Sequence, residues 1–566
     1  MKRRWILREV SPQDQMALSS LLTISPIMAS VLLARGVLTE KQAHEWLSAD
    51  GASVRDPFLL PDMERAVDRL RGAVRTGERV CFYGDYDVDG MAATSVYLDF
   101  FRGRGADTCW YIPDRVQEGY GLNTDAIGRL AREGVTLLVT SDCGTTSHAE
   151  IDHANALGMD AIITDHHQGD GELPRAVAVL NPHRSDSLYP FSGFCSAGLA
   201  YRVALAYCMK YGEGACPVNS LLDLVALATV ADIVPLHDEN RRDVRDGLAL
   251  MSHGSRCGIR ALKQVAGVDR PCTSDTVAFR LAPRINAAGR LAHAALGVEL
   301  LTTGSEARAM ELTVRLEELN RDRQRLEEDI SAEAVAGVTS GDDVHALIVW
   351  ARHWHVGVIG IVAARLVERY HCPAVVIAVN EQGIGKGSAR SVPGFDLYRA
   401  LAECRPVLQG FGGHPMAAGL TIEESRLAEF RERFTHVAAL WRRDQPRDPV
   451  LHVDAEVSLQ DVAPRLVREL ERLHPFGAGN PEPTLAVRNL NVLESRVVGD
   501  RHLKLTVRQP RSLPFESIGF RMGQLADQGV VAGQAIDLAF MPELQRWNGF
   551  DRVQLRIRDI RLSEPV

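Results

Sequence analysis

The stretch RVCFYGDYDVDG, residues Arg79–Gly90, joins a short apolar run directly to the three aspartates Asp85, Asp87 and Asp89. Other short apolar or β-branched runs follow, with helical stretches between most of them, at residues 136–140, 161–164 and 176–180. The alternation predicts a mostly parallel sheet covered by helices on both faces. The aspartates then lie at the carboxyl end of a strand, where open α/β sheets bind their ligands.

Acidic and imidazole side chains follow apolar residues at three more points: Asp142 in SDCGTT, Asp165, His166 and His167 in TDHH, and Asp232 in VADIVPL. Carboxylates and imidazoles together are ligands for divalent cations, and so many in one place suit two ions better than one. The three closely spaced carboxylates of the first motif would also repel one another without a cation. Two ions a few ångströms apart are a common arrangement for hydrolysing a phosphodiester.

An EF-hand calcium loop is the alternative for the first motif, because such loops also begin Asp-x-Asp-x-Asp-Gly. The twelfth position here is Val96, where a calcium loop requires a bidentate glutamate. A strand also precedes the motif, whereas a helix precedes an EF-hand loop. The sequence therefore excludes this alternative.

The size and composition of the chain indicate a soluble protein of several domains. With 566 residues, 46% hydrophobic and 24% charged, the chain is too long for one hydrophobic core. The net charge of −9 does not indicate a nucleic-acid binder, although carboxylates at a metal site contribute to that total. Ten cysteines lie scattered without a CxxC pair, which favours a reducing, cytoplasmic location.

An uncharged stretch near the start of the chain, residues 16–34, resembles a signal peptide or a membrane span. Pro26 divides it, and Ser25-Pro26 is typical of the first turn of a helix. We therefore expect packed helices here and no association with a membrane.

Five segments are expected along the chain: an N-terminal helical segment (1–55), an α/β domain (56–303), a long charged connector helix (304–340), a second α/β domain (341–441) and a C-terminal β-barrel (450–566). The connector is inferred from a narrow apolar stripe on a helix that is otherwise polar. Residues 442–449 have the composition of a linker. In residues 552–558, polar and apolar residues alternate, which predicts a strand with one buried and one basic face.

The four acidic motifs, in this order, resemble those of the DHH phosphoesterases. The resemblance extends to the RecJ family of bacterial single-strand-specific exonucleases through PDRVQEGYG (113–121), LAPRINAAGR (281–290), HWHVGVIGIVAARL (353–366), GKGSARSVPGFDL (385–397), FGGHPMAAGL (411–420) and HPFGAGNPEP (474–483). It implies a DHH core, a DHHA1-type second domain and an oligonucleotide-binding (OB-like) barrel. It spans nearly the whole chain.

The resemblance also implies two Mn²⁺ or Mg²⁺ ions and assigns roles. Asp85 and Asp87 would bind one ion, Asp89, His166 and Asp232 the other, and Asp142 would bridge them. Asp165 and His167 are the candidate catalytic residues. The candidates for binding a 5′-terminal phosphate are Arg115, Arg284, Arg390 and Ser388, because guanidinium groups bind phosphate in a bidentate manner and a hydroxyl adds a donor. His414 is a further candidate for binding the substrate, as a donor to a phosphate.

The expected function is therefore two-metal 5′→3′ hydrolysis of single-stranded DNA to mononucleotides, in repair and recombination. Cooperation with a single-strand-binding protein and a helicase is implied by the resemblance alone. Two alternatives stay open: a hydrolase of short oligoribonucleotides or cyclic dinucleotides, and a replication scaffold without catalysis. The full set of metal-ligand candidates argues against the scaffold.

Overall fold

The computed structural model describes residues 3–47, 54–169, 171–212, 217–254, 256–337, 344–443, 449–499, 501–547 and 550–563. The chain forms two compact units. The larger consists of Arg55–Pro235 and Asp243–Pro446, and the smaller of Met1–Val54, Leu236–Arg242 and Arg447–Val566. The expected linker at residues 442–449 lies mostly outside the described residues.

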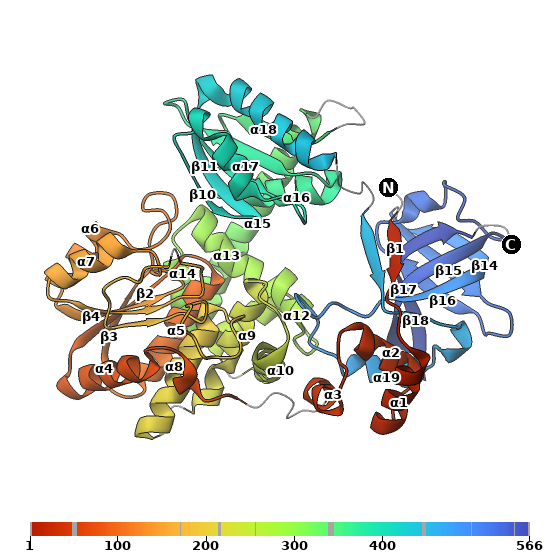
Figure 1. Cartoon of the computed structure of the whole chain (residues 1–566), viewed down its shortest axis with the longest axis horizontal. Helices are drawn as coiled ribbons and strands as arrows, with labels where there is room; N and C mark the ends of the chain where they lie inside the picture. The colour runs from red at the N-terminus through yellow and green to blue at the C-terminus, as the bar shows by residue number, and fades with distance from the viewer. Residues whose placement is uncertain are drawn as a thin grey trace. The chain divides into compact units, whose positions relative to one another are not determined.

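A parallel sheet organises the first part of the larger unit (Figure 1). Its strands lie in the order β3-β2-β4-β5-β6, and every neighbouring pair is parallel. They are β2 (Arg79–Gly84), β3 (Asp107–Tyr111), β4 (Val135–Ser141), β5 (Asp160–Thr164) and β6 (Ala178–Leu180). The parallel sheet predicted from the sequence is thus confirmed, and β2 lies near its centre.

Helices cover both faces of this sheet. Alternate residues of β2 point to opposite sides, and apolar side chains on each side pack against helices. On one side Phe82 stacks against Tyr97 of α5 (Val88–Arg102), with ring centroids 5.0 Å apart. On the other side Tyr83 is buried in a core that includes Ile127 and Ile151. Those two residues come from α6 (Thr124–Arg132) and α7 (His148–Ala156). Both faces are therefore apolar, as the continuous hydrophobic run of β2 predicts.

A helical region completes the first domain. It comprises α4 (Met63–Thr76), α8 (Ser196–Tyr211), α9 (Leu222–Ala231), α10 (Asp238–His253) from Asp243 onward, α11 (Cys257–Val265), α12 (Ser274–Thr276), α13 (Ala282–Leu291) and α14 (Ala295–Thr302). Helix α5 packs on α8 and α9, both of which are rich in buried alanine, valine and leucine. This packing brings the start of α8 and the end of α9 to the end of β2.

The long helix α15 (Glu306–Ala336) connects the two α/β domains. It packs on α11, α13 and α14 of the first domain and on α16 of the second. Leu312, Leu316 and Leu319 are buried along the narrow stripe that the sequence predicted, while most other positions are exposed. The connector helix is therefore confirmed.

The second α/β domain has a five-stranded sheet in the order β10-β11-β9-β8-β7. Its elements are β7 (Leu347–Ala351), α16 (Ile359–Tyr370), β8 (Ala374–Val379), β9 (Ile384–Arg390), α17 (Leu397–Glu403), β10 (Gly410–His414), β11 (Ala417–Glu423) and α18 (Leu427–Arg442). Only β7 and β8 pair in parallel. Helix α16 packs on β8 and β9, so that the start of this helix lies over Ser388 and Arg390.

The smaller unit is built around a closed barrel. Its strands are β14 (Leu485–Val498), β15 (His502–Arg508), β16 (Phe515–Gly519), β18 (Phe550–Leu562) and β17 (Ala535–Trp547), and β14 pairs with β17 to close the ring. The short strand β13 (Ala455–Glu456) extends β14, and α19 (Pro464–Glu471) packs nearby. Val553, Leu555 and Ile557 are buried, as the alternation in residues 552–558 predicted, but Gln554 on the polar face is buried as well.

The N-terminal segment belongs to the same unit as the barrel. Its helices α1 (Pro12–Leu22), α2 (Pro26–Ala34) and α3 (Glu40–Leu47) share one apolar core with barrel residues. The sequence predicted only helices here, whereas Arg4–Leu7 forms strand β1, which pairs in parallel with β12 (Val450–Val453). A strand of four residues that is ordered by a partner far along the chain leaves no periodic signal of its own.

No single helix among the described residues is long and apolar enough to cross a membrane. Helices α1 and α2 reach that length and composition only as a pair, and a bend of 113° separates them. Ser25 caps α2, with its side chain accepting the N–H of Met28 at 3.2 Å, as its position before Pro26 predicted.

Candidate active site

The loop after β2 places its aspartates at the start of α5. Asp87 caps this helix, because its Oδ1 accepts the N–H groups of Asp89 at 2.9 Å and Gly90 at 3.2 Å. Asp89 lies in the first turn and accepts the N–H groups of Ser196 at 2.6 Å and Ala197 at 2.9 Å, at the start of α8. Two helix N-termini therefore hold these carboxylates and favour their negative charge.

Helix α13 holds the same loop from outside. The Asn286 side chain accepts the N–H of Val88 at 3.1 Å. A Cβ on Gly289 would lie 2.3 Å from the carbonyl oxygen of Tyr86, so only glycine allows this approach. Both residues lie in the motif LAPRINAAGR, which was expected from the sequence to contribute only to phosphate binding.

The ends of β4 and β5 bring the next two motifs to the same place. Asp142 follows β4, and its Oδ1 lies 3.1 Å from Nε2 of His166 and accepts the Ser196 hydroxyl at 3.1 Å. Asp165 follows β5, and its Oδ1 lies 2.8 Å from Nδ1 of His167. Adjacent histidines thus differ in surroundings: His166 turns toward the aspartates from other strands, and His167 is paired with Asp165.

Asp232 completes the cluster from the end of α9. The His166 Nε2 atom lies 3.6 Å from Asp232 and 3.7 Å from Asp89, in addition to its contact with Asp142. The site contains three groups of three residues, and within each group the ligand atoms lie within 4.8 Å of one another. The groups are Asp85 with Asp87 and Asp142, Asp89 with His166 and Asp232, and Asp142 with His166 and His167. Asp142 and His166 each belong to two of these groups.

The electrostatics of the cluster call for cations. Burial, and then the charge of Asp87, raise the pKa of Asp85 well above its usual range and that of Asp89 to about 6. Burial, and then the charge of Asp89, raise the pKa of Asp142 well above its usual range and that of Asp232 to about 9. The Oδ1 atom of Asp85 is buried and accepts no hydrogen bond from the described residues.

The two histidines have pKa values shifted in opposite directions. Burial, and then the charge of His167, lower the pKa of His166 to about 4, which keeps its imidazole neutral and able to ligate a metal. Burial also opposes charge on Asp165 and His167, but their hydrogen bond lowers the pKa of Asp165 to about 2 and raises that of His167. This set of donors fits two divalent ions with oxygen and nitrogen ligands.

A group of arginines lies beside the cluster. Arg390 on β9 donates to the Ser388 hydroxyl at 3.0 Å, and burial and then the charge of Arg115 lower its pKa. Arg115 lies over the ring of Tyr86, 4.7 Å from its centroid. The structure therefore brings together three of the predicted phosphate-binding residues: Arg115, Ser388 and Arg390.

Arg290 is the residue of this group that was not predicted from the sequence. Its guanidinium donates to the carbonyl oxygen of Gly357 at 3.0 Å. Burial, followed by the charges of Arg115, Arg323 and Arg390, lowers its pKa to about 10. These guanidinium groups repel one another, so an anion that binds between them is strongly stabilised.

Arg284, which was predicted instead, forms an ion pair with Glu317 of α15 at 2.7 Å, and both side chains are largely buried. Both arginines lie in LAPRINAAGR, six residues apart. Only the three-dimensional arrangement distinguishes the arginine that joins Arg115 and Arg390 from the one that anchors the connector helix.

Other residues occupy definite places around the site. His414 at the end of β10 faces His167, with ring centroids 6.3 Å apart. Trp354 is 7% exposed and donates to Glu333 at 2.9 Å, so it is mainly a core residue. Tyr120, which was not predicted as a site residue, donates to the carbonyl oxygen of Asp142 at 3.0 Å and lies 3.2 Å from Nδ1 of His167.

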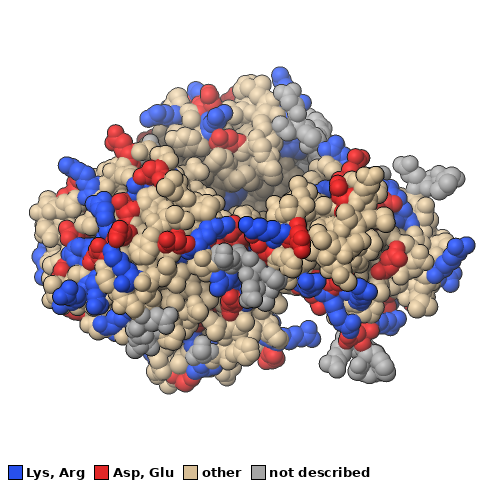
Figure 2. All heavy atoms as spheres, turned by 60° about the horizontal axis from the view of Figure 1, so that its bottom comes forward, with Lys and Arg blue, Asp and Glu red and all other residues tan. Residues whose placement is uncertain are grey.

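The basic face expected on the barrel is largely neutralised. Lys504 and Arg552 form ion pairs with Glu516 at 2.8 and 3.2 Å. Arg556 and Arg558 both contact Glu482. Acidic and basic side chains are likewise interspersed over the face shown in Figure 2. Charge alone therefore does not mark a nucleic-acid path.

Comparisons with known proteins agree with this architecture and first define the class. The sequence matches the profiles of the DHH family N-terminal domain over residues 79–229, the DHHA1 domain over 343–439 and the RecJ OB domain over 453–559. The fold and the acidic cluster are thus those of a DHH phosphoesterase with an added barrel.

Individual relatives narrow this class. The single-stranded-DNA-specific exonuclease RecJ of Bacillus subtilis is 37% identical over all of this chain and 71% of its own length. That of Dickeya dadantii is 36% identical over 89% of this chain and 91% of its own length. The chain belongs to the RecJ family.

A solved structure is similar throughout. The crystal structure of RecJ in complex with Mn²⁺ from Thermus thermophilus superposes with a TM-score of 0.86 at 28% identity, covering 100% of this chain and 80% of that one. A crystal structure of exonuclease RecJ bound to manganese gives a TM-score of 0.60 at 34% identity, covering 68% of this chain and 97% of that one.

The raised pKa of Asp232 predicts how the metal-free protein responds to pH. With a pKa of about 9 in the folded state and about 4 in the unfolded chain, Asp232 binds its proton more tightly when folded. Its stabilising contribution is complete below the unfolded value and is lost as pH rises through the folded value. In EDTA we expect the melting temperature to fall from about pH 6 to about pH 9, and to fall less in Asp232→Asn.

Adding Mn²⁺ should raise the melting temperature of the unmodified protein more at about pH 8 than at about pH 6, because protons and metal compete for the same oxygens. The exposed Asp152→Asn on α7 is the control, since Asp152 pairs with Arg175 at the surface. If the melting temperature fell equally with pH in the Asp232 and Asp152 variants, the raised pKa of Asp232 would be contradicted.

Proposed function

We propose that this chain is a metal-dependent exonuclease that removes nucleotides from the 5′ end of single-stranded DNA. The observation that carries the proposal is the position of a half-buried arginine group, Arg115, Arg290 and Arg390, directly beside three overlapping metal-ligand groups. A terminal phosphate held by these arginines leaves the next phosphodiester to reach the ligand groups. Membership of the RecJ family supports the substrate and the metal dependence.

The residues that would hold the ions are Asp85, Asp87, Asp89, Asp142, His166 and Asp232. When bound, two such ions lower the pKa of a coordinated water and stabilise the charge that develops on phosphate oxygens. A division in which the two ions would share Asp142 is supported by its presence in two of the three groups, one with Asp85 and Asp87 and one with His166, which itself occurs in two groups.

The chain's own residues supply orientation and hydrogen bonds. Asp165 holds Nδ1 of His167, which leaves Nε2 to donate to an oxygen of the scissile phosphate. Asp165 thus positions His167, and His414 approaches from the second domain. Arg390 and Arg290 orient the terminal phosphate, with the Ser388 hydroxyl as a further donor.

A role in DNA repair and recombination belongs to the same proposal, as do a single-strand-binding protein and a helicase as partners. The cytoplasmic location also stays a prediction. The narrower alternative, hydrolysis of short oligoribonucleotides or cyclic dinucleotides, would use the same metal ligands but would give the barrel no evident task.

Product analysis tests the proposal directly. The purified chain with Mn²⁺ is incubated with a long single strand labelled at one end or the other, with a duplex and an EDTA reaction as controls. We expect early release of the 5′-terminal mononucleotide, slow attack on the duplex and no reaction in EDTA. Turnover of dinucleotides without release from the long strand would favour the alternative instead.

The bridging position of Asp142 makes Asp142→Asn the most informative metal-site variant. Loss of a ligand shared by two groups should lower kcat at least about a hundredfold while the fold is kept. The matched control is Asp152→Asn, which should keep its activity. Near-normal turnover of Asp142→Asn, at an unchanged melting temperature, would refute the metal assignment.

The arginine group predicts a dependence on the 5′-phosphate. Arg390→Ala should lower kcat/KM for a 5′-phosphorylated strand by roughly tenfold to a hundredfold, the value of a charge-assisted hydrogen bond. The same strand with a 5′-hydroxyl end is the internal control, and its kcat/KM should change little. Equal losses on both strands would show that Arg390 does not contact the terminal phosphate.

A further inference from the structure

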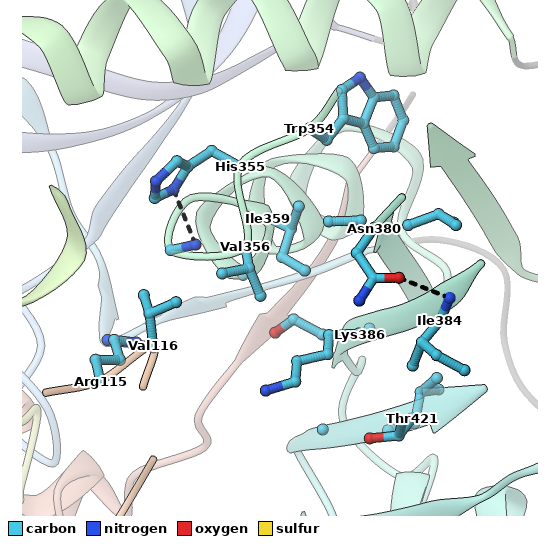
Figure 3. A pocket seen from close by; sticks show the side chains of 18 of the residues that line it. Arg115, Val116, Trp354, His355, Val356, Ile359, Asn380, Ile384, Lys386 and Thr421 are labelled. Atoms are coloured by element: carbon cyan, nitrogen blue, oxygen red, sulfur yellow. Dashed lines mark hydrogen bonds between the residues drawn. The ribbon is translucent and has the colours of Figure 1, made fainter. Parts of the chain in front are cut away.

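A cavity of about 790 Å³ opens beside the arginine group, between the Arg115 loop and the sheet of the second α/β domain (Figure 3). Its walls include Ser388 and Lys386 of β9 and Thr421 of β11. The volume lies within the range of about 300–1,000 Å³ that is usual for small-molecule sites. Arg390 is bound to Ser388 but does not itself line the cavity, and a single phosphate at these two residues fills only a small part of it.

The cavity extends away from the metal-ligand cluster. Arg390 pairs with Ala417 in the sheet, and Ala417 pairs with His414, whose ring faces His167. Arg390 therefore marks the end of β9 that is near the cluster. Lys386 lies four residues back along the strand, which corresponds to about 13 Å. Because strand residues alternate, Arg390, Ser388 and Lys386 all face the same side.

The floor of the cavity carries no side-chain bulk. Ser388 pairs with Gly419 across β9 and β11, and Gly419 pairs with Gly412 across β11 and β10. A Cβ on Gly412 would meet no atom within 4 Å, and one on Gly419 only the carbonyl oxygen of Gly387 at 3.8 Å. Packing does not demand glycine at either position. Side chains there would instead occupy the space in front of Ser388.

The charge of the lining is positive. The described residues that line the cavity include Arg115, Arg352 and Lys386 but no aspartate or glutamate. Arg352 is bound through two hydrogen bonds to Glu424, which lies outside the lining. Lys386 is exposed, and no carboxylate of the described residues lies within 4.0 Å of it. Lys386 is thus the cation available to a ligand at the far end.

Polar groups accompany this lysine. Thr421 pairs directly with Lys386 across the sheet. The Asn380 side-chain oxygen accepts the N–H of Ile384 at 2.8 Å, and in Figure 3 its amide nitrogen is turned toward the open space. Lysine, hydroxyl and amide donors together suit phosphate oxygens.

We propose that this cavity receives further phosphate groups attached to the 5′-terminal phosphate, so that strands with a 5′-diphosphate or 5′-triphosphate end are substrates. The inference rests on the proposed exonuclease function. The α-phosphate binds to Arg390 and Ser388, and the outer phosphates extend toward Lys386. Ser388 and Lys386 are two residues apart, or about 6.6 Å along the strand, a span that two further phosphates and a flexible lysine bridge.

The reaction keeps the polyphosphate intact. Water attacks the phosphorus between the first and second nucleotides, and the bond from that phosphorus to the 3′-oxygen of the first nucleotide breaks. The first nucleotide leaves as a nucleoside 5′-triphosphate with a 3′-hydroxyl, which takes up one proton of the water. The remaining strand carries a 5′-phosphate that contains the oxygen of the water, and it enters the next cycle as an ordinary substrate.

The test uses the full chain and three strands of one sequence with 5′-hydroxyl, 5′-phosphate and 5′-triphosphate ends. The first released nucleotide is identified by mass spectrometry, and kcat and KM are measured with Mn²⁺. We expect the triphosphate strand to release a nucleoside triphosphate. Lys386→Met should raise KM for this strand about tenfold and change KM for the 5′-phosphate strand less than about twofold. Lys386→Arg should keep KM for the triphosphate strand close to that of the unmodified chain.

Binding in EDTA gives a readout that does not depend on metal or turnover. The unmodified chain should bind the triphosphate strand more tightly than the 5′-phosphate strand, and Lys386→Met should lose that difference. Arg399→Met is the control for general charge, because Arg399 is 88% exposed and does not line the cavity. It should keep the difference.

The outcomes separate the two proposals. If the 5′-phosphate strand is not degraded either, the exonuclease function itself is wrong. If that strand is degraded but the triphosphate strand resists, or if Lys386→Met affects both strands alike, the polyphosphate site is wrong and the exonuclease function stands.

Discussion

The mutual repulsion of buried carboxylates is the constraint on which the rest of the larger unit depends. Four aspartates from different strands and helices meet here: Asp85, Asp89, Asp142 and Asp232. Burying each of them in its charged form beside the others is unfavourable and destabilises the fold. The fold offsets this with backbone N–H groups at the starts of α5 and α8, which leave the outward-facing oxygens to cations. A central strand with helix N-termini around its end is the architecture that brings these donors together.

The second domain depends on the first through one helix. Helix α15 packs on α13, and α13 carries both Arg290 and the two residues that hold the aspartate loop. The same helix packs on α16, whose first turn lies over Ser388 and Arg390. The spacing between the metal-ligand cluster and the phosphate-binding arginines is therefore set by packed helices. A rigid spacing of this kind positions a substrate better than residues on loops.

Local patterns revealed the chemistry, and the structure was needed for the geometry. Apolar runs followed by aspartates predicted strand ends, and Asp142 and His166 do follow β4 and β5, whereas the run before Asp232 is helix α9. The sequence pointed to Arg284, which pairs with Glu317, and not to Arg290, because two arginines in one helical motif differ only in what lies opposite each face. Tyr120 and Asn286 were missed since their roles arise from contacts across more than twenty residues of sequence. Strand β1 was missed because its partner lies near the other end of the chain.

The pairing of β1 with β12 also affects how the protein is made. Arg4 pairs with Val450, and the apolar side of α2 is buried in a core completed by barrel strands. At roughly 5–20 residues per second, synthesis reaches those partners on the order of a minute after the first segment has left the ribosome. During that interval Met28, Val31 and Leu32 have no core to enter. The nascent chain thus presents an apolar helix while its catalytic domains are already folding.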